Sequence, residues 1–124
     1  MRPPVLFGIE GEPDRECLGR VAAYATHTGI HEFRMFVGRD APFTTEQFRE
    51  YLLKHGREME LPKWGHYPRD RDALVLVATP DINWVHALFW CARRQSLLDC
   101  QQGGIHSIVE SDFNIKCWIP LKSA

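Results

Sequence analysis

Two apolar runs that lie close together in the second half of the chain constrain its fold more than any other feature. They cover residues 84–91 (WVHALFWC) and 95–99 (QSLLD), and a short polar gap, Ala92-Arg93-Arg94, separates them. Apolar runs joined by a loop of this length are typical of an antiparallel β-hairpin. We therefore expect two paired strands with a four-residue loop at residues 91–94.

The position of that loop decides which side chains of the hairpin face each other. With Trp90 paired to Gln95, His86 lies directly opposite Asp99 on the same face. Directly opposed residues have Cβ atoms about 4.5–5.5 Å apart, which suits a hydrogen bond from an imidazole N–H to a carboxylate. A slip of one residue places the two side chains on opposite faces. The hairpin therefore predicts a His–Asp pair that depends on where the loop lies.

A helix is predicted ahead of the hairpin, near the start of the chain. Asp14 can act as its N-cap, and the helix runs through about Thr28 to a terminating Gly29. Its core-facing stripe has the spacing of an amphipathic helix and consists of Leu18, Val21, Ala22 and Ala25. Cys17 falls in the first turn, where unsatisfied backbone N–H groups and the positive end of the helix dipole favour a thiolate. Cys17 is therefore a candidate for a chemically active cysteine.

Two more helices are predicted before the hairpin. Residues 30–37 form a short amphipathic helix that Gly38 ends. The next helix follows Thr44 and ends at Gly56. Four residues around its start form a capping box and a hydrophobic staple, namely Thr44, Gln47, Phe43 and Phe48. These signals are local, so we expect both ends of this helix to be well defined.

The remaining segments have the patterns of strands and turns. Residues 58–61 allow a short strand, and residues 73–79 form a continuous apolar run typical of a central buried strand. A turn is expected at Gly103-Gly104, and residues 115–121 form a closing strand. Helices followed by an antiparallel sheet indicate the α+β class, and 124 residues suffice for one domain with a substantial core.

Three residues have the identities of a nucleophilic thiolate, its base and the group that orients the base: Cys17, His86 and Asp99. A cysteine at the start of the first helix, with histidine and aspartate later on strands, is the papain-like order. On these features the chain resembles the bacteriocin-processing cysteine peptidases, including the peptidase domains that cut double-glycine leaders in export transporters. The matching pieces are Glu16-Cys17-Leu18, Gly29-Ile30, His86-Ala87-Leu88-Phe89-Trp90 and Leu97-Leu98-Asp99-Cys100.

The resemblance implies a single papain-like α+β domain over residues 1–124. It also implies a cysteine hydrolase that cleaves a peptide or related amide bond. In that role His86 takes the proton of Cys17, the thiolate attacks the carbonyl, and Asp99 fixes the imidazole tautomer. The expected partner is a peptide or protein substrate, and no cofactor is expected.

Three further residues are candidates for substrate binding. Trp84 and Trp90 share the strand face of His86. Gly11 stands six residues before Cys17, where the family places a glutamine whose amide helps to bind the oxyanion. The loss of one such donor typically costs on the order of 10²–10³ in rate. The chain departs from the family pattern at three positions, which are Gly11 for glutamine, Leu18 for glycine and Cys100 for proline.

Two other interpretations of the chain stay open. Gly11 in place of an amide donor fits a catalytically inactive peptidase-like domain that binds a peptide or protein partner. Alternatively, the chain is an inhibitor or interaction protein in which Cys17 is structural, buried and unreactive. The other two residues also have structural interpretations, since His86 can be a hydrogen-bonded, semi-buried histidine and Asp99 a turn residue at a strand end.

Charge and cysteine usage argue against several further classes. The net charge is −1 with acids and bases interspersed, and the longest basic run is Arg93-Arg94, which argues against a nucleic-acid partner. The apolar run near the N-terminus is too short for a signal peptide, and no stretch approaches the ~20 residues of a membrane span, so we expect a cytoplasmic protein. The four cysteines form no C-x-x-C pair and the histidines lack ligand spacing, so we expect reduced thiols and no metal site. The sequence leaves the oligomeric state open.

Overall fold

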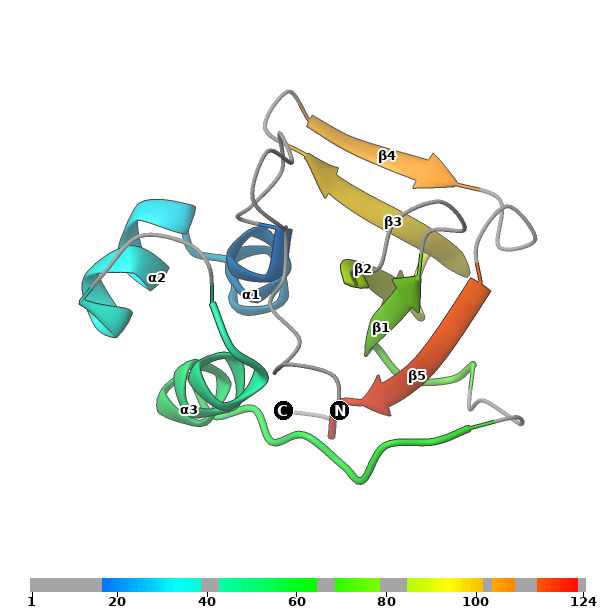
Figure 1. The fold of residues 1–124 in the computed structure, drawn as a ribbon, viewed down its shortest axis with the longest axis horizontal. Coiled ribbons are helices and arrows are strands. Elements are labelled where there is room, and N and C mark those ends of the chain that lie inside the picture. Colours follow the sequence, from blue (N-terminus) through cyan, green and yellow to red (C-terminus); the bar gives the residue numbers. More distant parts are fainter. Residues whose placement is uncertain are drawn as a thin grey trace, which may run out of the picture.

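The described part of the chain folds into three helices followed by a five-stranded antiparallel sheet (Figure 1). The computed structural model describes residues 17–38, 43–64, 69–78, 85–101, 104–108 and 114–122. The helices are α1 (Cys17–Thr26), α2 (Ile30–Val37) and α3 (Thr45–Lys54). The strands are β1 (Ala73–Ala78), β2 (Val85–Cys91), β3 (Ser96–Gln101), β4 (Gly104–Ile108) and β5 (Asn114–Pro120). The predicted α+β class, with helices before strands, is confirmed.

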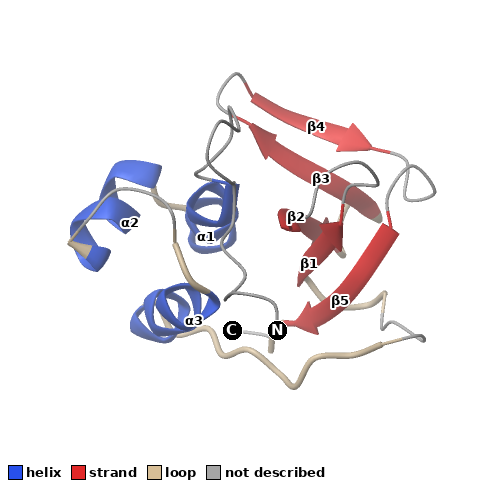
Figure 2. Cartoon of the chain, in the orientation of Figure 1, coloured by secondary structure: helices blue, strands red, loops and turns tan. Residues whose placement is uncertain are grey.

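The sheet places the predicted hairpin beside the first helix. Its strands are ordered β4-β3-β2-β1-β5, and every neighbouring pair is antiparallel. The three helices lie on one side of the sheet, and α1 packs against β2 and β3, the two strands of the hairpin (Figure 2). Strand β1 lies between β2 and β5, so its predicted interior position is confirmed.

Side chains are buried on both faces of the sheet. One face packs against the helices, and its buried residues include Phe89 and Leu98 from the hairpin. The opposite face forms a second cluster to which all five strands contribute, with Leu88, Trp90 and Trp118 among its buried residues. Because alternate residues of a strand enter different cores, the strands have near-continuous apolar sequences.

Helix α1 ends at Thr26, so the prediction that it continues through Thr28 was wrong. His27 adopts a left-handed conformation with φ of 58°, and the N–H of Thr28 donates to the Ala23 carbonyl at 2.9 Å. This is a Schellman motif in which histidine takes the place that glycine usually has. Gly29, the predicted terminator, is instead the N-cap of α2 in an extended conformation. The predicted N-cap of α1, Asp14, lies outside the described residues.

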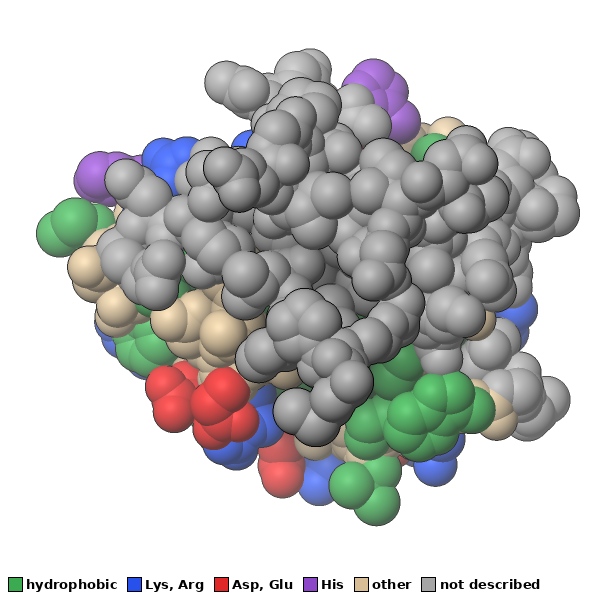
Figure 3. Space-filling view, in the orientation of Figure 1, with side chains coloured by type: hydrophobic (Ala, Val, Ile, Leu, Met, Phe, Trp, Pro, Cys, Tyr) green, Lys and Arg blue, Asp and Glu red, His purple; other side chains and the backbone are tan. Residues whose placement is uncertain are grey.

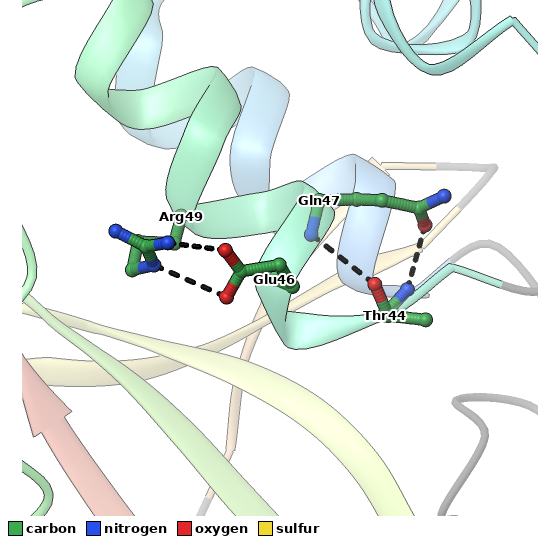
Figure 4. A network of polar contacts seen from close by, with 4 residues as sticks. All are labelled: Thr44, Glu46, Gln47 and Arg49. Atoms are coloured by element: carbon green, nitrogen blue, oxygen red, sulfur yellow. Dashed lines mark hydrogen bonds and ion pairs between the residues drawn. The ribbon is translucent and has the colours of Figure 1, made fainter.

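The predicted ends of the other two helices are confirmed. Gly38 ends α2 with a left-handed φ of 81°, and its N–H donates to the Arg34 carbonyl at 2.8 Å. At the start of α3, Thr44 and Gln47 form a complete capping box, with bonds of 3.1 and 2.8 Å between side chain and backbone (Figure 4). Gly56 follows α3 with a left-handed φ of 78°.

Helix α1 approaches its neighbours closely at one glycine. A Cβ atom added to Gly19 lies 2.5 Å from a side-chain atom of Ile30 and 2.8 Å from one of Phe43. The ring of Phe33 packs edge-on against that of Phe43 at 4.8 Å. Phe43 and Phe48, the predicted hydrophobic staple, are both fully buried in this core.

The segment after α3 runs beside β5 without forming the strand predicted at residues 58–61. Met59 makes an isolated bridge with Leu121, and Lys63 makes another with Trp118. Two separate bridges replace a regular ladder, so the prediction of a strand there was wrong. The predicted closing strand matches β5 to within one residue at either end.

Candidate active site

The hairpin forms, but its register differs from the predicted one. Trp90 pairs with Leu97, and the turn occupies Ala92 to Gln95. The predicted pairing of Trp90 with Gln95 was therefore wrong. The loop has four residues, as predicted, but begins one residue later, which moves each pairing by two positions. A two-residue change preserves the faces of the strands, so His86 and Asp99 still share one.

Contacts from a distant segment hold the turn in this position. The backbone of Gln95 adopts a left-handed conformation with φ of 48°. Its side-chain amide donates to the carbonyls of Ala92 at 2.7 Å and Arg69 at 2.9 Å. The Ala92 N–H donates to the Asp72 carboxylate at 2.9 Å. Arg69 and Asp72 precede β1, so the hairpin sequence alone contains no signal for this register.

The structure brings His86 and Asp99 together. The distance between His86 Nε2 and Asp99 Oδ1 is 2.9 Å, and both residues are buried, with 7% and 6% of their surface exposed. The observed register makes them diagonal rather than directly opposed neighbours. Diagonal neighbours remain within reach of long side chains, and the imidazole spans the extra distance.

Cys17 also interacts with the imidazole of His86. It is the first described residue of α1 and is fully buried, with 0% of its surface exposed. Its thiol is one of the two groups that raise the pKa of the His86 imidazole. The three predicted residues therefore form one connected group of side chains.

The protonation of His86 follows from these neighbours. Burial lowers the pKa of His86, but hydrogen bonds with Asp99 and Cys17 outweigh it and raise the pKa to about 9. At neutral pH the ring is therefore an imidazolium between a carboxylate and a sulfur atom. An adjacent His⁺ favours negative charge on a thiol.

Two residues of this group were not predicted to belong to it. Cys100 follows Asp99 and is buried; burial and the Asp99 carboxylate raise its pKa to about 12, so it remains a neutral thiol. Arg20 donates its Nε–H to the Cys100 carbonyl at 3.1 Å. The only sequence signal for Arg20 is its position three residues after Cys17, which places both on one side of a helix.

Trp90, a predicted substrate-binding residue, packs within the second core. It is 7% exposed, and its indole N–H donates to the Arg69 carbonyl at 3.1 Å. The centre of its ring lies 5.5 Å from that of Trp118, and the Arg69 guanidinium lies 4.9 Å from the centre of the Trp90 ring. Trp90 lies four positions after His86 on the strand, a distance of about 13 Å. This packing favours a structural role for Trp90.

The remaining predicted residues lie elsewhere. Trp84 and Gly11, the other candidates for substrate binding, lie outside the described residues. His106 of β4 lies directly opposite Asp99 and is exposed. Thus the described part of the site consists of the three predicted catalytic residues together with Arg20 and Cys100.

Other properties of the described residues bear on the kind of site. They contain no group of three His, Cys, Asp or Glu side chains placed to hold a metal ion. None of the helices in the described ranges is both long and apolar enough to cross a membrane. On the face shown in Figure 3, acidic and basic side chains lie next to one another along the lower edge.

Comparison with protein-family models and with curated protein sequences found no match for this chain. Any assignment of function therefore depends on the geometry of the site.

Proposed function

We propose that this protein is a papain-like thiol hydrolase that cleaves a peptide or related amide bond, with Cys17 as nucleophile, His86 as acid and base, and Asp99 as the residue that orients His86. The observation that carries the proposal is the buried 2.9 Å contact between His86 and Asp99, with Cys17 interacting with the same imidazole. A thiol, its base and an orienting carboxylate in this order are the parts that nucleophilic catalysis requires.

The proposed reaction uses each residue in a defined step. The Cys17 thiolate attacks the carbonyl carbon, and the oxyanion is bound by backbone N–H groups at the start of α1. The His86 imidazolium then donates its proton to the leaving amine as the carbon–nitrogen bond breaks. Neutral His86 next takes a proton from water, whose hydroxide attacks the thioester. Cys17 leaves as a thiolate, His86 is an imidazolium again, and the acid is released.

Asp99 sets the geometry of the imidazole in this scheme. Its carboxylate accepts the Nε2–H of His86, so the proton that moves during the reaction is the one on Nδ1. It also stabilises the positive charge of the imidazolium at neutral pH, because the pair is buried from solvent.

The fold and family follow as parts of the same proposal. A nucleophile helix packed on an antiparallel hairpin that carries the base is the papain-like arrangement. We include in the proposal a relation to the peptidases that cut double-glycine leaders, with a peptide or protein as substrate. The four cysteines are free thiols, which suits a reducing compartment such as the cytoplasm.

The first test is the pH dependence of Cys17 alkylation by iodoacetamide, read by peptide mass spectrometry. In the folded wild-type protein we expect Cys17 to react well below pH 8.5, the ordinary pKa of a thiol, and to react about tenfold more slowly or worse in His86→Ala. Cys91, also buried and on β2, serves as the internal control, and its rate of labelling is expected to be the same in the wild type and in His86→Ala. Labelling of Cys17 that follows the ordinary thiol pKa, unchanged in His86→Ala, contradicts the proposal.

The complete burial of Cys17 favours a second candidate, an interaction protein in which Cys17 is structural and which binds a peptide or protein partner without cutting it. Cys17→Ala separates the two functions. In an enzyme it abolishes cleavage of a peptide library; in a binding domain it leaves the affinity for captured peptides nearly unchanged. Resistance of Cys17 to alkylation at every pH in the folded protein, with normal labelling after unfolding, favours the binding domain.

A further inference from the structure

We propose that Arg20 is a positioning residue that fixes helix α1, which carries Cys17, against the part of β3 that carries Asp99. The inference rests on the proposed function, because it concerns how the three residues of that site are held at their working distances. Arg20 contacts no reacting atom in this proposal.

The hydrogen bond of Arg20 connects the two elements directly. Arg20 lies three residues after Cys17, so both side chains leave the same side of α1. Its Nε–H donates at 3.1 Å to the carbonyl of Cys100, eighty residues further along the chain. That carbonyl belongs to the residue directly after Asp99. Because the acceptor is backbone, the bond holds the strand itself rather than one rotamer of a side chain.

Charge reinforces this contact. Burial lowers the pKa of Arg20, and Arg34 of α2 lowers it further; Asp99 and Cys100 of β3 act in the opposite direction. The guanidinium therefore lies near the same carboxylate that accepts the His86 hydrogen bond. Two cationic groups, one from α1 and one from β2, therefore interact with Asp99.

A hydrogen bond to the backbone fixes the distance between two elements more closely than apolar packing does. Much of the contact between α1 and the hairpin is made by buried apolar side chains such as Leu18 and Phe89, which tolerate small displacements. Catalytic geometry does not tolerate them, since a misplacement of about 1 Å can cost about 10²-fold in rate. The Arg20 bond thus fixes the position of α1 relative to the hairpin, and with it the distance between Cys17 and His86.

The test compares Arg20→Gln with a matched control, Arg57→Gln. Arg57 is also half-buried and also donates to a backbone carbonyl, that of Ala25 at 3.1 Å, and it pairs with Asp72. NMR titration of the His86 ring in each protein reports whether Asp99 is still in place. Removal of a positive charge alone raises the pKa of a neighbouring imidazole. A fall in the His86 pKa therefore reports loss of positioning.

We expect Arg20→Gln to move the His86 titration about one pH unit lower, and Cys17 alkylation at pH 6 to slow about tenfold. Arg57→Gln is expected to lower thermal stability while both readouts stay at their wild-type values. A His86 titration unchanged in Arg20→Gln, or lowered equally in Arg57→Gln, overturns the inference.

The two proposals can fail separately. If Cys17 of the wild type reacts as an ordinary thiol while the His86 titration still falls in Arg20→Gln, the hydrolase proposal fails and the positioning role of Arg20 stands. Should Arg20→Gln not fold, Arg20→Lys replaces it, because an ammonium cannot present the Nε–H and a second planar N–H together. In Arg20→Lys the pKa of His86 is expected to fall by less than in Arg20→Gln. An unchanged His86 pKa in folded Arg20→Lys contradicts the inference.

Discussion

His86 owes its protonated state to two neighbouring side chains. Burial opposes a charged imidazole, but Asp99 and Cys17 outweigh it and raise the pKa of His86 to about 9. The identities of these residues could be predicted because each is the usual residue type for its role. Their geometry could be predicted only in part, since the contact is diagonal and not directly across the hairpin.

Replacement of the carboxylate tests this dependence on single residues. Asp99→Asn keeps the shape and an acceptor oxygen but removes the charge, so the His86 titration is expected to fall by about 1–3 pH units, the range that one nearby opposite charge produces. NMR titration of the ring measures it. Asp72→Asn is the control, because Asp72 binds Arg57 and the Ala92 N–H. A His86 titration that stays near pH 9 in Asp99→Asn removes the carboxylate as the cause.

At the scale of helices and strands, capping residues and glycines close to a helix end were sufficient to predict where that helix begins or ends. The capping box of α3 and the glycines after α2 and α3 lie within a few residues of the ends that they define. The end of α1 was mispredicted because His27 adopts the left-handed conformation two residues before the nearest glycine. The hairpin register was mispredicted because its turn is held by Arg69 and Asp72, outside the hairpin.

The packing of α1 on α2 gives a prediction at this scale. In an exposed helix a glycine-to-alanine change is stabilising by about 0.5–1 kcal/mol. At Gly19 the new methyl group meets Ile30 at 2.5 Å and the Phe43 ring at 2.8 Å. Ile30 can move its terminal methyl, but the buried ring cannot yield as easily. We therefore expect Gly19→Ala to lower the free energy of unfolding by about 1–3 kcal/mol, the usual cost of overpacking.

Urea unfolding of Gly19→Ala measures that loss, with Gly29→Ala as the matched control. Gly29 has φ of −102°, and a Cβ there meets nothing within 4 Å. Because alanine is a poorer N-cap residue than glycine, Gly29→Ala is expected to lose up to about 1 kcal/mol through the cap alone, with no steric clash to add to it. Equal stability of the two variants contradicts the close approach of α1 to α2.

At the scale of the whole molecule, the sheet separates two cores, and the candidate site lies where α1 meets the hairpin. Buried side chains fill both faces of the sheet, so periodicity alone could predict the strands but not which residues face the helices. The link from Arg20 to Cys100 spans eighty residues and connects a helix to a strand backbone. No local pattern predicts such a contact, so the sequence could predict that Cys17, His86 and Asp99 come together but not that Arg20 joins α1 to β3.

The buried imidazolium makes the free energy of unfolding of the whole protein depend on pH. The pKa of His86 is raised from 6.5 to about 9 on folding, so between these values the folded protein holds a proton that the unfolded chain has released. The contribution of His86 to the free energy of unfolding therefore falls as pH rises through this window. The contribution is complete below pH 6.5 and lost by about pH 9, with a ceiling of about 3 kcal/mol.

Urea unfolding of Cys17→Ala and of Cys17→Ala/His86→Gln at pH values from 6 to 8.5 measures this contribution. Cys17 is removed from both proteins because a thiolate that forms on folding releases a proton and offsets the proton that His86 takes up. Cys17→Ala is expected to lose stability across part of the series, since Cys17 itself helps to raise the pKa of His86, whereas the neutral amide of the double variant removes that slope. The series stops at pH 8.5 because the raised pKa of Cys100 adds its own loss once thiols of the unfolded chain ionise. Parallel slopes in the two variants mean that His86 is not a buried imidazolium.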